Sequence, residues 1–242
     1  MLDKMKNQSL YRPKLWPTLS TVLGLRVSAV VPGPSLRSLG SDLEETFLDG
    51  AAAALTEPLL PSLLGTWVHV HGARLRTEKL ALMARKRLLD EPQLAFWLTV
   101  FAAYGVSLGQ SKWRVVLKEV AKQAKAYQPE DMALLAAAIG GEPWLAETDL
   151  ALPRGALRIR EGDVLSVGEL ASANEQYRLR LLYGADLRAD IHWALHAKVT
   201  APAQVKELVF CSQSAATAIL NDIAAAKAAL EARSALMGQK AG

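Results

Sequence analysis

The chain of 242 residues is poor in several residue types that mark particular classes of protein. Its single cysteine, Cys211, excludes an intramolecular disulfide and any zinc site built from several cysteines. A lone cysteine fits a reducing compartment, so we expect a cytoplasmic protein. Aromatic residues make up only 6% of the chain, although six of them are Trp. The dominance of Ala and Leu favours helices.

Long hydrophobic runs are also scarce. The uncharged run at 94–109 has 16 residues, fewer than the roughly 20 that a bilayer-spanning helix needs. The apolar stretch at 15–31 is interrupted by Pro17 and Arg26, and no small-residue cleavage pattern follows it. We therefore expect a buried helix at 94–109, no signal peptide and no membrane partner.

Motifs that bind nucleotides are absent. The pair Gly140-Gly141 is not part of a GxGxxG or GxxxxGK[ST] pattern, and Gly162 and Gly168 are isolated. Cys211 lies between Phe210 and Ser212 without a convincing base beside it in sequence, which is typical of a packed thiol. The sequence thus predicts no catalytic residues and no cofactor, and an enzyme is the least supported class.

The four histidines form two pairs with spacings that metal ligands use. His69 and His71 lie on one face of a strand predicted at 67–71, and His192 and His196 lie one helical turn apart. Nothing nearby completes either set, because Trp193 stands where a zinc-protease motif has its glutamate. Structural or solvated histidines are the favoured interpretation, with a metal site as the alternative.

The net charge of +4 conceals a strong alternation along the chain. Residues 71–128 sum to +7, residues 129–175 to −6, and residues 176–242 to +3. Two basic regions separated by an acidic one suit a polyanion partner if the basic regions share a face. The alternative is that an isoelectric point near 9.2 is ordinary for a soluble protein.

Helix-start patterns recur through the first half of the chain. Ser41 and Glu44 have capping-box spacing, and Thr56-Glu57-Pro58 and Asp90-Glu91-Pro92 combine a capping oxygen, an acid and a first-turn proline. Further helices are expected from Thr77 to about 89, from Ser111 to about 127, and from Pro129 to the glycine pair at 140–141. Residues 41–141 are therefore predicted to be mostly helical.

Strand patterns are few. Segments 156–160 and 164–167 alternate around Glu161-Gly162-Asp163, which predicts a small β-hairpin. It follows a change in composition at Pro153-Arg154-Gly155. The predicted fold is mainly α, with a helical domain at 1–153 and a second domain at 154–242 that contains the hairpin and further helices.

One predicted helix has a basic stripe. Its cations are spaced by four, four and three residues, and Val116, Val120 and Ala124 lie on another face. The cations are Arg114, Lys118, Lys122 and Lys125. Such a stripe can neutralise nucleic-acid phosphates, but a solvated face on a surface helix is the commoner explanation.

Residues 185–230 are predicted to form three consecutive helices. An amphipathic helix at 185–196 is followed by a short helix at 203–209, a turn at 210–212 and a helix from Gln213 to beyond Ile223. The apolar positions Val205, Val209, Cys211, Ala216 and Ile219 provide a small core. This quarter of the chain resembles the helix-turn-helix core of prokaryotic DNA-binding domains, particularly winged ones.

The resemblance implies a set of DNA contacts. Base readout falls to Ser212, Gln213, Ser214 and Thr217 at the start of the second helix. Backbone contacts fall to Arg178, Arg180, Arg188, Lys198 and Lys206, together with the stripe above. The sequence departs from the family at Lys206 and Phe210, where a small residue and a glycine are usual, and no wing follows Ile223.

The sequence therefore predicts a DNA-binding protein, a transcriptional regulator that reads duplex DNA through a helix-turn-helix. Ile219, Ile223, Ala226 and Leu230 follow one face of the Ala-rich tail, so a second copy or a protein partner is expected there or on the N-terminal domain. The alternative is a helical scaffold subunit of a larger complex with no direct DNA readout.

Overall fold

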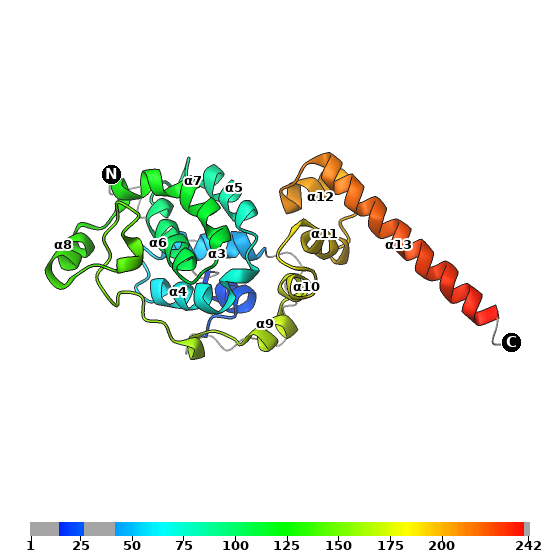
Figure 1. The fold of residues 1–242 in the computed structure, drawn as a ribbon, viewed down its shortest axis with the longest axis horizontal. Helices are drawn as coiled ribbons and strands as arrows, with labels where there is room; N and C mark the ends of the chain where they lie inside the picture. Colours follow the sequence, from blue (N-terminus) through cyan, green and yellow to red (C-terminus); the bar gives the residue numbers. More distant parts are fainter. Residues whose placement is uncertain (1–14, 27–41, 240–242) are drawn as a thin grey trace.

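The protein is built almost entirely from helices (Figure 1). The computed structural model describes residues 15–26 and 42–239, and no β-strand occurs among them. The helices of the first half are α2 (Leu15–Thr18), α3 (Leu43–Ala53), α4 (Leu60–His71), α5 (Thr77–Arg87), α6 (Leu94–Ser107), α7 (Arg114–Ala124) and α8 (Glu130–Ile139). Those of the second half are α9 (Val167–Ala173), α10 (Glu175–Tyr183), α11 (Leu187–His196), α12 (Pro202–Val209) and α13 (Gln213–Gln239). The prediction of a mainly α fold is confirmed.

Short helical turns connect several of these helices. They are η2 (Leu19–Leu23), η3 (Gly72–Arg74), η4 (Ser111–Trp113), η5 (Lys125–Tyr127), η6 (Pro143–Leu145) and η7 (Glu161–Asp163). All are 3-10 turns except η2, which is a π-helix that ends at Gly24 in the left-handed region with φ of 68°. A Cβ at Gly24 would also approach Leu165 to 2.9 Å, so glycine fits both the backbone and the space.

The N-terminal body is organised around α6, which is buried along most of its length. Its Trp97 and Phe101 stack, and Phe47 of α3 contacts Phe101, Trp67 and Trp113. The buried helix expected at 94–109 is thus present. Within the described ranges no single helix is both long and apolar enough to cross a membrane, and α12 with α13 meets that test only as a pair bent by 113°.

The strand predicted at 67–71 is wrong, because these residues are the last turn of α4. Five alternating residues are too few to separate a strand from a buried helix. The hairpin at 156–167 is wrong as well. Its turn is the 3-10 helix η7, and Arg158 and Arg160 donate their backbone N–H groups to Ser62 Oγ and Thr66 Oγ1 of α4. The first half of the segment therefore hydrogen-bonds to side chains of α4, and its second half pairs with the backbone at Gly24 and Arg26 through an isolated bridge.

Polar side chains begin several helices. Asp42 caps α3 by accepting the N–H groups of Glu44 and Glu45, while Ser41 of the predicted capping box lies outside the described residues. Asn174 and Asp186 cap α10 and α11 in the same way. Thr77, predicted as a cap, is instead the first residue of α5. The beginnings of α5, α7, α8 and α13 were thus predicted to within a few residues, whereas α9 and α10 were not predicted.

The C-terminal helices pack around a second, smaller hydrophobic core. It contains Ile191 and Ala194 of α11, Val205 and Val209 of α12, and Ala216 and Ile223 of α13. The first core extends as far as Tyr177, so residues 157–177 pack with the N-terminal body. The division at 153/154 stays a prediction, and this packing favours a later one.

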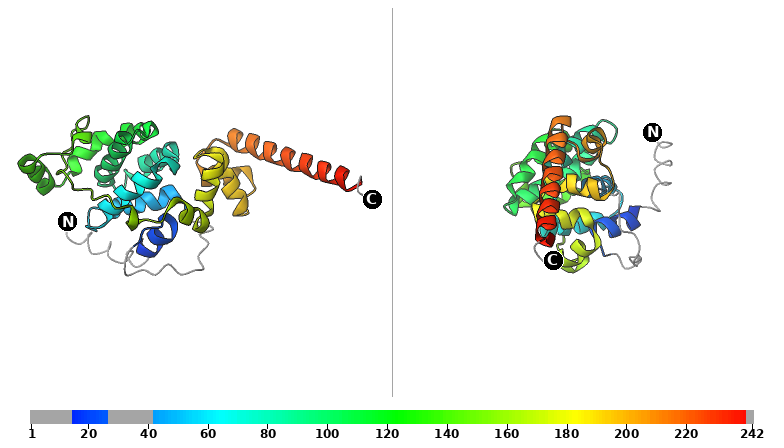
Figure 2. Two further views of the ribbon diagram at one scale, coloured as in Figure 1. Left: turned by 60° about the horizontal axis from the view of Figure 1, so that its bottom comes forward. Right: turned by 90° about the vertical axis from the view of Figure 1, so that its right-hand side faces the viewer.

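Helix α13 projects away from the rest of the molecule (Figures 1 and 2). Ile223 is its last buried residue, and every later position whose side chain is described is exposed. At 1.5 Å per residue, residues 224–239 extend about 24 Å beyond the small core.

Candidate nucleic-acid interface

The first turn of α13 is open to solvent. The side chains of Ser212, Gln213 and Ser214 are exposed, and Thr217 is half-buried. Ser212 Oγ accepts the backbone N–H of Ala215 at 3.1 Å and lies 3.0 Å from Ser214 Oγ, so its hydroxyl acts as a helix cap. Of the four residues predicted to read bases, Gln213 has the longest polar side chain that projects freely.

The turn between α12 and α13 is held from the N-terminal body. Phe210 has a left-handed backbone with φ of 53°, a conformation that glycine adopts more readily. Its ring packs against the first core. The guanidinium of Arg76, at the start of α5, donates to the carbonyl oxygens of Val209 at 2.7 Å and Phe210 at 3.1 Å. These bonds fix the position at which α13 begins.

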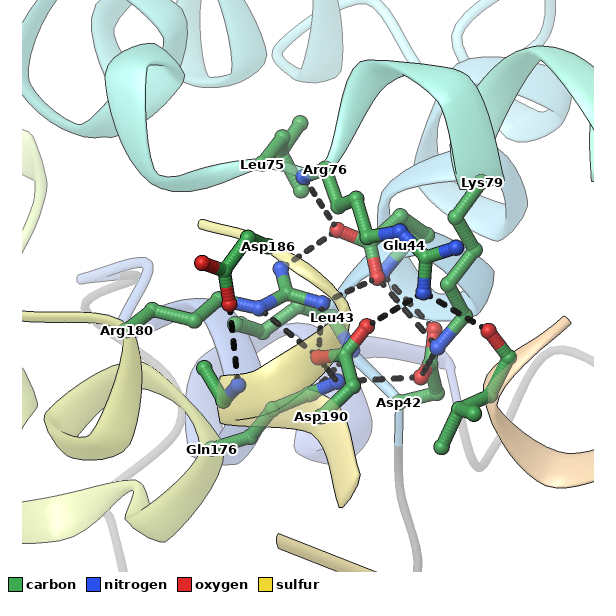
Figure 3. Close-up of polar contacts among 12 residues, drawn as sticks. Asp42, Leu43, Glu44, Leu75, Arg76, Lys79, Gln176, Arg180, Asp186 and Asp190 are labelled. Atoms are coloured by element: carbon green, nitrogen blue, oxygen red, sulfur yellow. Dashed lines mark hydrogen bonds and ion pairs between the residues drawn. The ribbon is translucent and has the colours of Figure 1, made fainter. Parts of the chain in front are cut away.

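Arg76 belongs to a buried network of charges that joins α3, α5, α10 and α11 (Figure 3). Arg180 donates to Glu44 Oε2 at 2.8 Å and to Asp190 Oδ1 at 2.7 Å, and Arg76 donates to Asp190 Oδ2 at 3.0 Å. The other members are Asp42, Lys79 and Gln176. The three cations match the three carboxylates, so the cluster is neutral overall.

Burial alone would lower the pKa values of Arg180 and Lys79, but the surrounding carboxylates raise both of them. Glu44 is the strongest of these influences for each cation, followed by Asp190 for Arg180 and by Asp42 for Lys79. Both residues therefore stay charged. Since the side chain of Arg180 is completely buried and paired, the prediction that it contacts DNA phosphates is wrong.

The other cations predicted to contact the DNA backbone are accessible. Arg178 and Arg188 are exposed and pair with Glu175 and, at 3.6 Å, with Asp222. Lys198 is exposed with φ of 62°, and half-buried Lys206 pairs with Glu207 at 3.3 Å. Surface pairs of this kind are weak, so these cations can exchange partners. Their role toward phosphates stays a prediction.

The basic stripe lies on α7 and η5. Arg114, Lys118, Lys122 and Lys125 are all exposed, while Val116 and Val120 are buried. The stripe belongs to the N-terminal body, and α5 lies between it and the turn at Phe210 in Figure 1. The two predicted basic surfaces thus come from different parts of the chain.

Sequence reasoning missed the cations of α5. The Lys86 ammonium lies 4.9 Å from the centre of the Phe210 ring, and Arg85 pairs with Glu119 of α7 at 2.6 Å. No local pattern shows that the end of α5 lies beside residue 210. The position of Arg85 and Lys86 relative to this turn depends on the tertiary fold.

The histidine pairs have ordinary partners. His69 contacts Tyr104, and buried His71 lies 2.7 Å from the Tyr177 hydroxyl and 2.9 Å from the Leu165 carbonyl oxygen. His192 stacks on Tyr183, and His196 pairs with Glu175. Among the described residues no group of three or more His, Cys, Asp or Glu side chains could hold a metal ion.

Cys211 is half-buried, and burial raises the pKa of its thiol. A raised pKa keeps the thiol protonated at neutral pH, which makes it a poor nucleophile. Comparison with protein-family models, curated proteins and solved structures gave no significant match. The function proposed next therefore rests on the residues and their geometry.

Proposed function

We propose that this protein binds duplex DNA through α12, the turn at 210–212 and the start of α13, as a cytoplasmic transcriptional regulator without chemistry of its own. The supporting observation is the pair α12 and α13, which meet at 113° across a short turn. Helix-turn-helix units have angles of about 90–120° and place the start of the second helix in the major groove. The exposed first turn of α13 has the accessibility that this role requires.

Gln213 is the main candidate for reading a base, because its amide can pair with adenine through two hydrogen bonds. Ser214 is placed to contact a base edge or a phosphate, and the capping hydroxyl of Ser212 faces the same solvent. Arg178, Arg188, Lys198 and Lys206 would contact the DNA backbone. Arg180 has a structural role instead, because it pairs with Glu44 of α3 and Asp190 of α11 in the buried network.

A second copy of the chain is the proposed partner in DNA recognition. In a dimer, the second helix of each helix-turn-helix lies on one of two successive half-sites, about 34 Å apart. Two weak contacts made together give a higher affinity than either alone. The exposed face of α13 at Ala226 and Leu230 offers one place for this contact, and the N-terminal body offers another.

A scaffold subunit is the second candidate function. The observation that favours it is α8, whose Leu134, Leu135 and Ile139 are 65%, 49% and 58% exposed. Three large apolar side chains on one solvent-facing helix are typical of a protein-binding surface. A scaffold would retain its partner at salt concentrations that release DNA.

Fluorescence anisotropy with a randomised duplex tests the DNA-binding proposal. If about four phosphates are contacted, affinity should fall about a hundredfold between roughly 50 and 200 mM salt. Gln213→Ala should then lower the discrimination between selected and random sequences about tenfold, in line with one bidentate base contact. Gln204→Ala, an exposed glutamine of α12 to which no base contact is assigned, is the matched control and should leave the discrimination between sequences unchanged. Failure to bind any duplex at low salt would refute the proposal.

A further inference from the structure

The end of α5 reaches the turn that precedes α13. Lys86 lies 4.9 Å from the Phe210 ring centre, and Phe210 is only two residues before Ser212. A cation over an aromatic face is favourably placed, and its ammonium stays exposed at the same time. The N-terminal body therefore supplies a positive charge directly beside the proposed DNA-reading helix.

The same helix is joined to the basic stripe on its other side. Arg85, adjacent to Lys86, donates to both carboxylate oxygens of Glu119 on α7, at 2.7 and 2.6 Å. This hydrogen bonding is the main cause of the lowered pKa of Glu119, and the charge of Lys122 contributes as well. Lys122 is thus close to the junction of α5 and α7. Helix α5 thus contacts both α7, which carries most of the stripe, and the turn at Phe210.

We call a set of exposed or half-buried cations on α7, η5, α5 and α12 the basic band. The band consists of Arg114, Lys118, Lys122 and Lys125, then Arg85 and Lys86, and finally Lys206 on α12. Its ion pairs involve two carboxylates, Glu119 and Glu207, so five positive charges are in excess. In Figure 1, α5 lies between α7 and the C-terminal helices α12 and α13.

We propose that a single DNA duplex lies along this basic band, so that α5 and α7 hold the phosphates flanking the site read by α13. This inference rests on the proposed function and extends it. The stripe from Arg114 to Lys125 is about 16 Å long at 1.5 Å per residue, the length of roughly five base pairs. The protein therefore covers a longer duplex than its α12–α13 unit alone.

The position at which the band ends favours a DNA duplex, rather than an acidic protein, as its binding partner. Lys86 lies over the Phe210 ring in the turn that precedes Gln213, and Lys206 is four residues before Phe210 on α12. A regular line of phosphates beside a groove matches a row of cations that leads to a helix of neutral hydrogen-bonding side chains. An acidic protein surface offers no such groove.

Salt dependence of binding to two duplexes tests the inference. The duplexes share one selected site at their centre and have about 12 and about 30 base pairs, so only the longer one has flanking phosphates. The test variant combines K86Q, K118Q and K122Q, three exposed cations of the band. The control variant combines R154Q, R158Q and R160Q, three exposed cations of a segment that hydrogen-bonds to α4.

On the longer duplex, the test variant should lower the slope of log affinity against log salt by roughly 3, about one per lost contact. On the shorter duplex its slope should change by about 1 at most, because only Lys86 lies beside the shared site. The control variant should match the wild type on both. Thermal unfolding of each variant checks that the charge changes leave the fold intact.

Two outcomes would overturn the inference while the proposed function survives. One is a test variant that matches the wild type on the longer duplex. The other is a control variant that loses as much slope as the test variant, which would show an effect of net charge only. If the wild type binds neither duplex, the proposed function fails and the inference fails with it.

Discussion

The N-terminal body and the C-terminal helices are stabilised in different ways. The body has a core rich in large rings, with Trp67, Trp97 and Trp113 fully buried. The core formed by α11, α12 and the start of α13 has six buried side chains without an aromatic ring, and Trp193 of α11 lies in a separate small cluster. A unit of about 40 residues rarely folds on such a core alone. Its attachment to the body through Arg76 and Asp190 is therefore part of its stability.

This difference shows that a buried network of charges can join two parts of a protein where the apolar core is small. A buried ion network gives less net stability than well-packed apolar side chains of the same volume. It does require specific partners, because each unpaired charge would be costly. The network therefore selects one orientation of the C-terminal helices.

The largest expected effect comes from removing the central cation of that network. Arg180→Met leaves Glu44 and Asp190 buried without their main partner, so the free energy of unfolding should fall by about 3–5 kcal/mol. Urea unfolding followed by circular dichroism measures it. Arg178→Met, two residues away and exposed, should cost less than about 1 kcal/mol. Equal losses for the two variants would show that the network is not the stabilising contact.

A smaller effect is expected from His71, which links α4 to Tyr177 of α10. Burial lowers the pKa of His71 from 6.5 to about 4. The unfolded chain then binds the proton more tightly than the folded protein, so stability is full above pH 6.5 and falls as the pH drops toward 4. The loss should reach about 3 kcal/mol.

The variant His71→Gln isolates this contribution, because Gln can accept from Tyr177 and donate to Leu165 without titrating. The wild type should lose its advantage over this variant between pH 6.5 and 4. The readout is urea unfolding at several pH values in that window. A constant difference across the window would contradict the assignment to His71.

The smallest loss of stability is expected for a substitution in the part of α13 that lies beyond the small core. Ile223 and Leu230 lie seven residues apart on α13, but their exposed fractions are 8% and 63%. Ile223→Ala should cost about 2–4 kcal/mol, whereas Leu230→Ala should change stability by less than about 0.5 kcal/mol in dilute solution. Thermal unfolding at several protein concentrations measures both. A large loss for Leu230→Ala that grows with concentration would reveal a contact with a second copy.

Local patterns predicted most of the helices, although not α9 and α10, and they predicted the long-range contacts poorly. Asp90-Glu91-Pro92 precedes α6, and Gly140 ends α8, since caps and breakers act within a few residues. The alternation at 67–71 was misleading because the same residues suit a buried helix. Both errors in strand prediction concern segments packed on or within α4.

The candidate site was predictable only in part, for the same reason. The turn and the exposure of Gln213 follow from the local sequence. The burial of Arg180 depends on Glu44, 136 residues away, and Arg178 looks equivalent to it in the sequence. The contact of Lys86 with Phe210 likewise joins residues that are distant along the chain. No local pattern encodes either contact.

Arg76 has a consequence for how the two regions communicate. Its backbone N–H donates to Glu44 Oε1 at 2.9 Å, and its side chain donates to the carbonyl oxygens of Val209 and Phe210. Arg76 thus connects the residues directly before α13 to Glu44 in the first turn of α3. If DNA binding shifts the start of α13, the hydrogen-exchange rate of the buried Arg76 backbone amide should change with it, because the same residue holds both ends of this connection.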